Sequence, residues 1–391
     1  MKITDIFTAY QDYVLPTYTK TPLVFVKGKG SRLWDIQNKP YLDFFPGWGV
    51  GNLGHCHPKV MQAVREQISK LIFIPNNYYH LPQAKLAKEL IYWAFPGKVF
   101  FCNSGAEANE AAIKFSRKFG QGRFEIITFE NSFHGRTLAA LAATGQKKYQ
   151  DGFEPLPAGF KTVKFNDLEA VKNALSDHTV AIMLELIQGE GGVNVATKDF
   201  VLALRNLCDK NKLLLIVDEV QTGIGRTGKL FCFQHYGIIP DIITLAKALG
   251  GGLPIGVMIV KKEISDTLGP GMHASTFGGG PVISKAALAV LRAIQEEKLL
   301  SNAQKMSNYL FLKLNQLKDK FPVIKEVRGL GLMAGVELEK EGKPLVEKCL
   351  EKGLLINCTH DKVLRLMPAL NITAKEIDRG ISILTEALSG I

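Results

Sequence analysis

The sequence predicts an α/β protein with a large domain built on a mostly parallel sheet and a smaller α+β domain. From residue 99 onward, short apolar runs alternate with helix-length segments, which is the pattern of repeated βαβ units. After about Gly280 the pattern changes, and 391 residues are enough for both domains. We expect an N-terminal arm and part of the small domain in residues 1–52, the large domain in 53–280 and the C-terminal small domain in 281–391.

The first part of the chain predicts an arm, a small ribbon and a ligand-facing loop. Two β-like pieces, residues 23–26 and 32–36, are separated by turn signals at Gly28 and Gly30. The loop YLDFFPGWGVGNLGHCHPKV is dense in glycine and aromatic residues, so its backbone can approach a ligand closely. A helix is expected over residues 58–71.

The two domains differ in how strands and helices follow one another. In the large domain the apolar runs predict strands at residues 99–102, 125–129, 180–186, 213–217, 242–246 and 255–260. In the small domain we expect a long helical run over 284–319, a strand at 332–338, a helix at 344–352, strands at 354–356 and 363–366, and a closing helix from Thr373.

Asp218 and Lys247 each follow a short run of large aliphatic residues that predicts a buried strand. Ligands of open α/β sheets bind at the carboxyl ends of the strands, where both side chains would lie. Burial lowers the pKa of a lysine and frees its amine for covalent work. Catalysis by pyridoxal 5′-phosphate (PLP) uses such a lysine to bind the cofactor and a carboxylate to hold a proton on the pyridine nitrogen. A structural ion pair is the alternative.

Two further stretches suit the ends of such a cofactor and its substrate. Residues 103–109, NSGAEAN, open a helix after a strand, and Ser104 with its small neighbours can bind phosphate there, although a serine at this place can simply cap the helix. Phe133 and Arg136 lie in a loop after another strand. They suit a flat ring over the pyridine and a fork for a carboxylate; a core phenylalanine and a surface arginine are the alternative.

Glu190 and Arg365 are a candidate ion pair between the two domains. Glu185 ends a buried strand and Glu190 follows in the loop, while Arg365 is flanked by aliphatic residues in the small domain. A partly buried arginine needs a carboxylate, and the pair can equally be permanent structure. His55 and His57 resemble a zinc motif only superficially, because no further ligands follow, and we expect no metal.

Composition narrows the class of protein. The formal charge of +11 is spread along the chain without basic blocks, so we expect a solvated basic surface and no nucleic-acid partner. The longest uncharged apolar stretch, residues 248–260, is too short to span a bilayer, and no secretion signal is visible. Six scattered cysteines fit reduced thiols. We therefore expect a cytoplasmic protein without a membrane partner.

Taken together, the chain resembles the class III, or ω-, aminotransferases of PLP fold type I, and most closely the acetylornithine aminotransferases. The resemblance covers nearly the whole chain through GHCHP, NSGAEANEAAIK, FHGRT, IQGEGGV, VDEVQTGIGRTG, ITLAKALGGGLPIG, STFGGGP, RGLGLMAGVEL and GLLINCTHDKVLRLMPALNIT, in that order. It implies a large PLP-binding domain with a mostly parallel seven-stranded sheet flanked by helices, and a homodimer with shared active sites.

The resemblance also implies a role for each cofactor-binding residue. Lys247 would bind PLP covalently and Asp218 would pair with its pyridine nitrogen. Gln221 would contact the phenolic oxygen and Phe133 would stack on the ring. The phosphate would be held by Ser104, Gly105, Ala106 and, from the neighbouring subunit, Thr276.

For the substrates, the resemblance implies transfer of the δ-amine of N-acetylornithine to 2-oxoglutarate, giving N-acetylglutamate 5-semialdehyde and glutamate in arginine biosynthesis. Arg136 would bind the carboxylate far from the reacting amine. Glu190 would neutralise Arg365 while the amino donor is bound and would release it for the α-carboxylate of 2-oxoglutarate. Succinylornithine, ornithine, 4-aminobutyrate or a lysine on an acidic carrier protein are alternative donors. An aminomutase or decarboxylase of the same fold is a further alternative.

Three residues depart from the family pattern. Trp48 stands where ornithine aminotransferases have a tyrosine and acetylornithine enzymes usually a smaller aliphatic residue, so its bulk can reshape the substrate pocket. Gly280 replaces the usual asparagine of the GGNP run, and Leu186 replaces the usual proline after the strand glutamate. We expect local backbone changes at these two positions.

Overall fold

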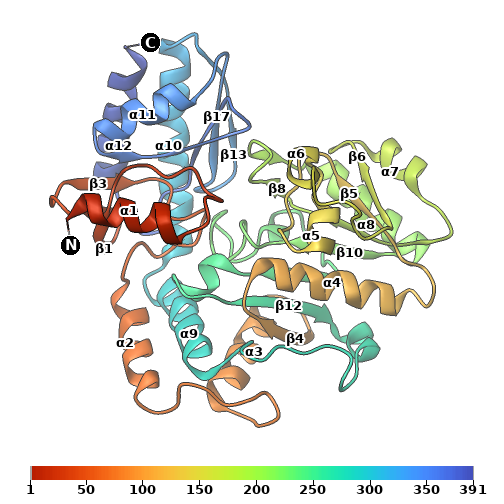
Figure 1. Ribbon diagram of the computed structural model, residues 1–391. Helices are drawn as coiled ribbons and strands as arrows, with labels where there is room; N and C mark the ends of the chain where they lie inside the picture. Colours follow the sequence, from red (N-terminus) through yellow and green to blue (C-terminus); the bar gives the residue numbers. More distant parts are fainter. Residues whose placement is uncertain (1, 391) are drawn as a thin grey trace.

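The computed structural model describes residues 2–390 and is centred on a seven-stranded sheet (Figure 1). In spatial order the strands are β4 (Gly97–Cys102), β12 (Gly256–Lys261), β11 (Ile242–Leu245), β10 (Leu214–Asp218), β7 (Thr179–Leu184), β5 (Glu125–Phe129) and β6 (Phe160–Val163). Strand β12 is antiparallel to both neighbours, whereas the other neighbouring pairs are parallel. The predicted α/β fold with a mostly parallel sheet is confirmed.

Strand β10 is buried on both faces because its side chains alternate between two layers of helices. Leu214 and Ile216 pack in a cluster with the alanine-rich side of α4 (Gly105–Phe119), whereas Leu215 and Val217 pack in the cluster that includes α8 (Lys198–Asn211). The other helices of this part are α2 (Pro58–Ile68), α3 (Leu81–Trp93), α5 (Leu138–Ala143), α6 (Lys147–Gln150) and α7 (Leu168–Ala174). Short 3-10 helices are η1 (Cys232–His235), η2 (Lys247–Gly250) and η3 (Lys262–Thr267).

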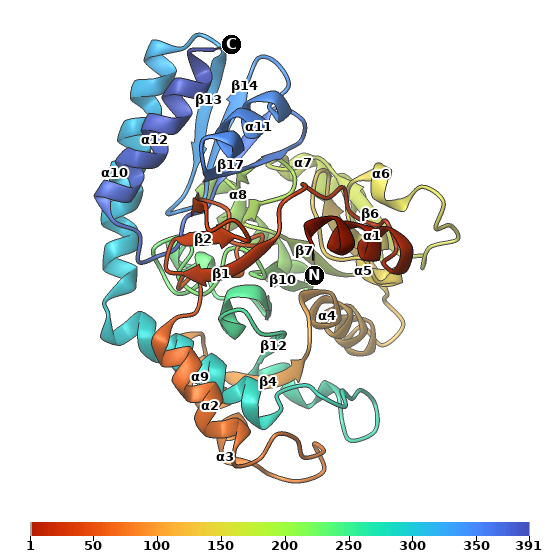
Figure 2. The same cartoon turned by 60° about the vertical axis from the view of Figure 1, so that its left-hand side comes forward.

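The N-terminal segment joins the C-terminal part of the chain through a shared sheet. The ribbon β1 (Phe25–Lys29) and β2 (Arg32–Asp35) continues into β3 (Pro40–Asp43), which pairs in parallel with β15 (Leu354–Leu355). Figures 1 and 2 both place this red segment beside the blue C-terminal elements. The arm itself begins with helix α1 (Ile3–Tyr13), which the residue pattern did not predict.

The C-terminal part contains a second four-stranded sheet and three helices. The sheet order is β13 (Ile324–Gly329), β14 (Ala334–Leu338), β17 (Val363–Leu366) and β16 (Asn357–Thr359), and the helices are α10 (Leu299–Lys320), α11 (Lys343–Glu351) and α12 (Ala374–Leu388). A two-stranded ribbon, β8 (Ile187–Gln188) with β9 (Asn194–Val195), lies at the junction with the large sheet.

The expected helical run over 284–319 is wrong as a single helix. It consists of α9 (Pro281–Glu296) and α10, which are separated at Lys298, a residue with a left-handed φ of 53°. Helix α9 packs against α2 and α3 at the foot of the molecule in Figure 2, whereas α10 runs up to the C-terminal sheet. The division at 280/281 remains a prediction, as does the division at 52/53.

Candidate active site

Asp218 and Lys247 are brought together at one edge of the large sheet. Strand β10 ends at Asp218, which lies in register with Thr244 of the neighbouring strand β11, and Lys247 follows two residues after the end of that strand. Both side chains line a cavity of about 490 Å³. Lys247 has a left-handed φ of 45°, an uncommon conformation for a residue with a side chain, at the point where the chain turns from the strand into η2.

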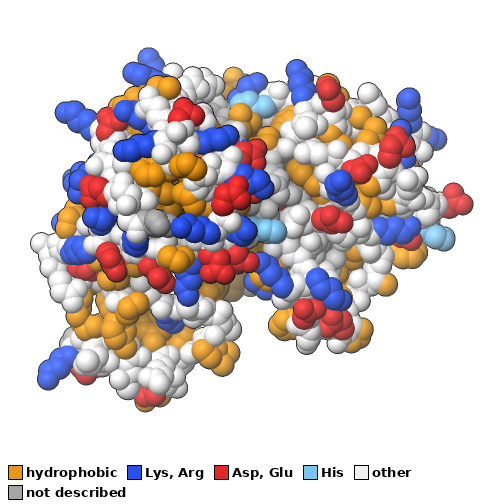
Figure 3. All heavy atoms as spheres, turned by 90° about the horizontal axis from the view of Figure 1, so that it is seen from above, with side chains coloured by type: hydrophobic (Ala, Val, Ile, Leu, Met, Phe, Trp, Pro, Cys, Tyr) orange, Lys and Arg blue, Asp and Glu red, His pale blue; other side chains and the backbone are white. Residues whose placement is uncertain are grey.

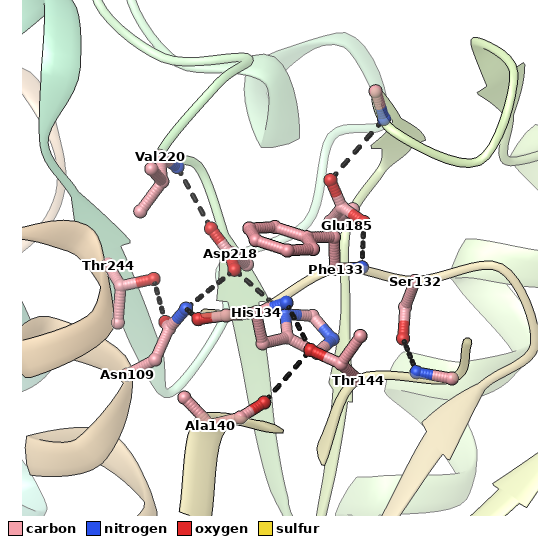
Figure 4. Close-up of polar contacts among 12 residues, drawn as sticks. Asn109, Ser132, Phe133, His134, Ala140, Thr144, Glu185, Asp218, Val220 and Thr244 are labelled. Carbon is pink, nitrogen blue, oxygen red and sulfur yellow. Dashed lines mark hydrogen bonds and ion pairs between the residues drawn. The ribbon is translucent and has the colours of Figure 1, made fainter. Parts of the chain in front are cut away.

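The Asp218 carboxylate is only 4% exposed and is oriented by three donors (Figure 4). Its Oδ2 accepts hydrogen bonds from Asn109 Nδ2 at 2.8 Å and His134 Nδ1 at 2.8 Å, and its Oδ1 accepts one from the Val220 backbone N–H at 3.0 Å. Asn109 is itself fixed by Thr244, whose hydroxyl donates to Asn109 Oδ1 at 2.7 Å. This network holds a negative charge at a defined place in the cavity wall.

The amine of Lys247 is poised to lose its proton. Burial lowers the pKa of Lys247, and the nearby guanidinium of Arg365 lowers it further, while the carboxylates of Glu190, Asp218 and Glu185 oppose the shift. Among the described residues, Lys247 forms no ion pair within 4.0 Å. A neutral amine facing a cavity is the form that attacks a carbonyl carbon.

The start of helix α4 provides an anion-binding corner of the cavity. Ser104 is the N-cap, and its Oγ accepts a hydrogen bond from the Glu107 backbone N–H at 3.1 Å, so this serine does cap the helix, while phosphate binding remains a prediction. The hydroxyl proton remains free to donate, and Ser104, Gly105 and Ala106 all line the cavity. Gly105 has no room for a side chain, because an added Cβ would lie 2.8 Å from Val220. The helix dipole also favours an anion at this corner.

Phe133 and Arg136 come from a loop that packs against the start of α4, since a Cβ added at Gly135 would lie 2.9 Å from Ala106. Both line the cavity, and the Arg136 guanidinium lies over the Tyr149 ring at 4.1 Å and the Phe133 ring at 5.6 Å. Arg136 is exposed and makes no ion pair within the described residues, so its fork is available to an acidic ligand. The predicted pairing of an aromatic ring with a free arginine is therefore present in the structure.

Glu185 connects this wall to the loop that carries Glu190. Its Oε2 accepts a hydrogen bond from the Phe133 backbone N–H at 2.9 Å, and its Oε1 accepts one from Gly189 at 3.3 Å (Figure 4). Burial raises the pKa of Glu185 well above its ordinary value, and the Asp218 carboxylate raises it further. Glu185 therefore keeps its proton to a higher pH than an exposed glutamate does.

The predicted pair of Glu190 and Arg365 is formed. Arg365 Nη1 donates to Glu190 Oε1 at 2.7 Å, and Arg365 is fully buried. Burial alone would raise the pKa of Glu190, but the Arg365 guanidinium holds it below its ordinary value. Gln221 contacts both: its Oε1 accepts from Arg365 Nη1 at 3.1 Å and its Nε2 donates to Glu190 at 3.4 Å. Gln221 lines the cavity, and the ion pair lies behind it.

Four sequence-predicted positions lie away from the cavity wall. Trp48 is 47% exposed with a left-handed φ of 56°, and it packs edge-on against Phe45, whose ring lies 4.8 Å from the Arg365 guanidinium. Thr276 is exposed in the loop before α9. Leu186 is buried between β7 and β8, and Gly280 is the N-cap of α9 without a side-chain hydrogen bond. Trp48 is thus linked to Arg365 through the ring of Phe45.

Several site residues were not singled out from the sequence, namely Asn109, His134, Thr244 and Asn357. Thr244 had a signal, because it is the one hydroxyl in an otherwise aliphatic predicted strand. His134 and Asn109 stand inside two of the recognised motifs, but only the fold brings them to Asp218.

The two histidines of the GHCHP motif bind different carboxylates. His55 contacts Asp43 at 2.7 Å and His57 contacts Glu297 at 3.2 Å. Within residues 2–390, no cluster of three or more potential metal ligands is formed.

The cavity fits PLP on the chemistry of its walls. An anion corner, an aromatic ring, a buried carboxylate and a buried amine surround one space, and each matches one part of that cofactor. His134 bonds to Asp218 through Nδ1, whereas its buried Nε2 has no hydrogen-bond partner among the described residues. The fold and cavity thus define an α/β enzyme with a covalent lysine site for a phosphorylated aromatic cofactor.

Comparison with known proteins agrees with this class. The model of the family "Aminotransferase class-III" matches residues 13–388. An acetylornithine aminotransferase of Methanocaldococcus jannaschii is 53% identical over 97% of this chain and 96% of the relative. A succinylornithine transaminase of Salmonella paratyphi A is 42% identical over 95% and 93%. The solved ornithine aminotransferase of Toxoplasma gondii, described with partial occupancy of PLP, superposes with a TM-score of 0.96 at 33% identity, covering 100% and 95%. The chain belongs to the class-III aminotransferase family, which confirms the resemblance inferred from its motifs.

Proposed function

We propose that this enzyme transfers the δ-amine of N-acetylornithine to 2-oxoglutarate with PLP as cofactor, a reaction of arginine biosynthesis. The observation that carries the proposal is a cavity lined by one free arginine, Arg136, with a second arginine, Arg365, buried behind Gln221 and paired with Glu190. Such a site can accept one carboxylate permanently and a second one conditionally. The family and the names of the relatives point to the same reaction.

The cofactor would be held by residues from several elements. Its phosphate would lie at Ser104, Gly105 and Ala106, its ring against Phe133, its phenolic oxygen at Gln221 and its pyridine nitrogen at Asp218, with Lys247 as the covalent partner; all of these side chains or backbones line the cavity. When bound, PLP withdraws electrons from the carbon that carries the reacting amine.

The residues of the chain divide the remaining work between them. Asp218, fixed by Asn109 and His134, would hold a proton on the pyridine nitrogen of bound PLP. Lys247 would hold the cofactor covalently before the substrate binds and would then move a proton at Nζ to and from the substrate carbon; burial lowers its pKa, which favours the proton-accepting amine. Both residues stand at or just after the end of a buried strand, which fixes where their side chains enter the cavity.

Glu190 would decide which carboxylate the site accepts. While N-acetylornithine is bound by its side-chain amine, its α-carboxylate lies at Arg136, and the Glu190–Arg365 pair at 2.7 Å offers no second carboxylate site. The α-carboxylate of 2-oxoglutarate would displace Glu190 from Arg365 while Arg136 binds the other end. One cavity can thereby serve a donor and an acceptor of different length.

A panel of half-reactions tests the proposal. The PLP-loaded enzyme is mixed with N-acetylornithine, succinylornithine, ornithine, 4-aminobutyrate or lysine acylated on its α-amine, and loss of the absorbance of the lysine-bound cofactor is followed. We expect the highest kcat/KM for N-acetylornithine and regeneration of that absorbance by 2-oxoglutarate. Succinylornithine is the second candidate donor, because a relative at 42% identity is a succinylornithine transaminase. Failure of 2-oxoglutarate to restore the absorbance would instead favour a mutase or decarboxylase.

We also propose a homodimer with shared active sites. The loop that carries Thr276 is bonded to the 71–81 segment, where Asn76 Nδ2 donates to the carbonyls of Ser275 and Gly278 at 3.0 Å. The exposed apolar side chains of these two segments are Leu71, Ile72, Phe73, Tyr78, Tyr79, Leu81, Met272 and Phe277. An exposed apolar patch of this kind marks an interface, and it would carry Thr276 to the phosphate corner of a neighbour. Sedimentation at micromolar concentration should show twice the mass of 43.1 kDa, and a monomer would contradict the proposal.

The cytoplasm is the proposed compartment. All six cysteines are free thiols, as expected of a protein in a reducing environment. In the part of the chain that the structure describes, no helix is both long and apolar enough to cross a membrane. Positive and negative side chains are interspersed on the face shown in Figure 3, in keeping with a solvated basic surface. Fractionation of cells that express the enzyme tests this placement.

A further inference from the structure

The short strand β16 contacts both members of the Glu190–Arg365 pair. Asn357, at its start, lies directly across from Arg365 of β17 in the sheet register. Thr359, at its end, reaches the loop of Glu190. Because side chains alternate along a strand, these two residues share one face, and Cys358 between them faces the other way. This three-residue strand thus contacts Arg365 and the backbone of Glu190 with side chains of one face.

Asn357 fixes the edge of the arginine that faces away from Glu190. Its Oδ1 accepts hydrogen bonds from Arg365 Nε at 3.2 Å and Nη2 at 2.9 Å. The remaining nitrogen, Nη1, donates toward Glu190 Oε1, Gly189 O and Gln221 Oε1. The planar fork is therefore held along its Nε side, and its Nη1/Nη2 end is the part that a carboxylate can approach.

Thr359 fixes the backbone of Glu190. Its Oγ1 donates to the Glu190 carbonyl at 2.6 Å. Two neighbouring carbonyls are held as well, since Arg365 Nη1 donates to Gly189 O at 2.8 Å and Arg328 donates to Gly192 O at 3.0 and 2.6 Å. With these three carbonyls bound by side chains of the C-terminal part, Glu190 can leave Arg365 only by rotation of its own side chain.

We propose that Asn357 and Thr359 are positioning residues for the second half-reaction: Asn357 holds the Arg365 fork in place when Glu190 swings away, and Thr359 keeps the Glu190 backbone fixed so that the side chain returns to the same place. This inference rests on the proposed function of the pair as a gate. It assigns a specificity role to a strand whose residues are not among those that line the cavity.

The chemistry of an amide suits this task better than that of a carboxylate. Arg365 is fully buried, so its Nε and Nη2 donors need acceptors in either state of the gate. The Asn357 carbonyl satisfies both without cancelling the positive charge. A carboxylate at this position would neutralise Arg365 permanently, and the α-carboxylate of 2-oxoglutarate would then gain little by displacing Glu190.

The test compares Asn357→Leu and Asn357→Asp with Cys358→Ala, a change on the opposite face of the same strand. Steady-state KM and kcat are measured separately for the amino donor and for 2-oxoglutarate. We expect both Asn357 variants to raise KM for 2-oxoglutarate about tenfold, which corresponds to the loss of one charge-assisted interaction, with KM for the donor changed less than about twofold. Cys358→Ala should change neither. Thermal unfolding and cofactor absorbance verify that each variant is folded and loaded.

Calorimetric binding of glutarate, an unreactive dicarboxylate, separates this inference from the proposed donor. If N-acetylornithine proves to be a poor substrate, the proposed function fails, yet weaker glutarate binding by Asn357→Leu than by wild type would still support the positioning role. Equal glutarate affinity in wild type and Asn357→Leu, or equal increases in KM for donor and acceptor, would overturn it. Thr359→Val should lower the preference for N-acetylornithine over glutamate as donor, and an unchanged preference would overturn its part.

Discussion

Lys247 is a base held where its positive charge is costly. Burial lowers its pKa, and the residues that offset this effect, Glu190, Asp218 and Glu185, act through space without an ion pair. The same burial that destabilises the protonated amine prepares it for bond formation. The buried amine that the function needs therefore lowers the stability of the folded protein until the cofactor binds it.

Replacing Lys247 by methionine should therefore stabilise the cofactor-free protein. Because the folded-state pKa is lowered, the penalty is complete at pH values below that pKa and disappears as the pH rises toward the ordinary 10.5, where the unfolded chain also loses the proton. We expect Lys247→Met to raise the free energy of unfolding by on the order of 1 kcal/mol near neutral pH. Urea titrations at a series of pH values measure the difference, and a gain that grows with pH would contradict this explanation.

The place of Asp218 and Lys247 at strand ends could be predicted, because each directly follows a run of aliphatic residues in the sequence. The side-chain partners of Asp218 could not, since Asn109 and His134 come from two separate segments and meet Asp218 only in the fold, where Thr244 in turn holds Asn109. The same holds for Asn357, whose contact with Arg365 depends on strand register. The role of Trp48 at the substrate pocket remains a prediction; its ring packs on Phe45, which in turn lies against the Arg365 guanidinium.

Among the elements, helix α4 combines a structural and a binding role at one residue. Ser104 caps the helix by accepting from the Glu107 backbone, and it also lines the cavity. Thr373 caps α12 in the same way, accepting from Glu376 at 3.3 Å, far from the cavity lining. Comparing the two caps therefore separates the contribution of Ser104 to helix stability from its contribution to phosphate binding.

Ser104→Ala and Thr373→Ala should each lower the free energy of unfolding by about 1 kcal/mol, the usual contribution of an N-cap. Only Ser104→Ala should also weaken PLP binding, by about tenfold, since a phosphate hydrogen bond is lost. Equilibrium dialysis with PLP measures the affinities. Unchanged PLP affinity in Ser104→Ala would show that the serine acts as a cap alone.

Elements with strong periodicity were predicted well, and short polar ones were not. The strands at 125–129 and 363–366 agree with β5 and β17 in every residue. Strands β6, β13 and β16 were missed, because β16, for example, consists of Asn-Cys-Thr and has no apolar alternation. The break between α9 and α10 lies at Lys298, which is neither glycine nor proline, so no residue type announced it.

On the scale of the whole molecule, Arg226 joins the parts of the chain that form the site. It lies in the loop after β10 and is fully buried; its Nη1 donates to the carbonyls of Leu332 at 2.7 Å and Pro368 at 2.6 Å, and its Nη2 donates to Asn52 Oδ1 at 2.5 Å. Burial lowers the pKa of Arg226 to about 9. One side chain thus holds three segments that are distant in sequence.

Arg226→Lys should destabilise the enzyme by roughly 1–3 kcal/mol, because one ammonium cannot reach all three acceptors and leaves buried oxygens without partners. Arg379→Lys, a change of an exposed arginine on α12, is the control and should have little effect. Thermal unfolding of the PLP-loaded proteins measures both. Equal unfolding temperatures for the two variants would contradict a joining role for Arg226.

We propose that one cavity serves two different substrates because Glu190 forms an ion pair with Arg365 in one half-reaction and not in the other. The most direct measurement is the ratio of kcat/KM for N-acetylornithine to that for glutamate, in single half-reactions of wild type and Glu190→Gln. Without the charge that neutralises Arg365, the α-carboxylate of glutamate should bind more easily, so we expect the ratio to fall by about tenfold or more. A ratio unchanged from wild type would contradict the account.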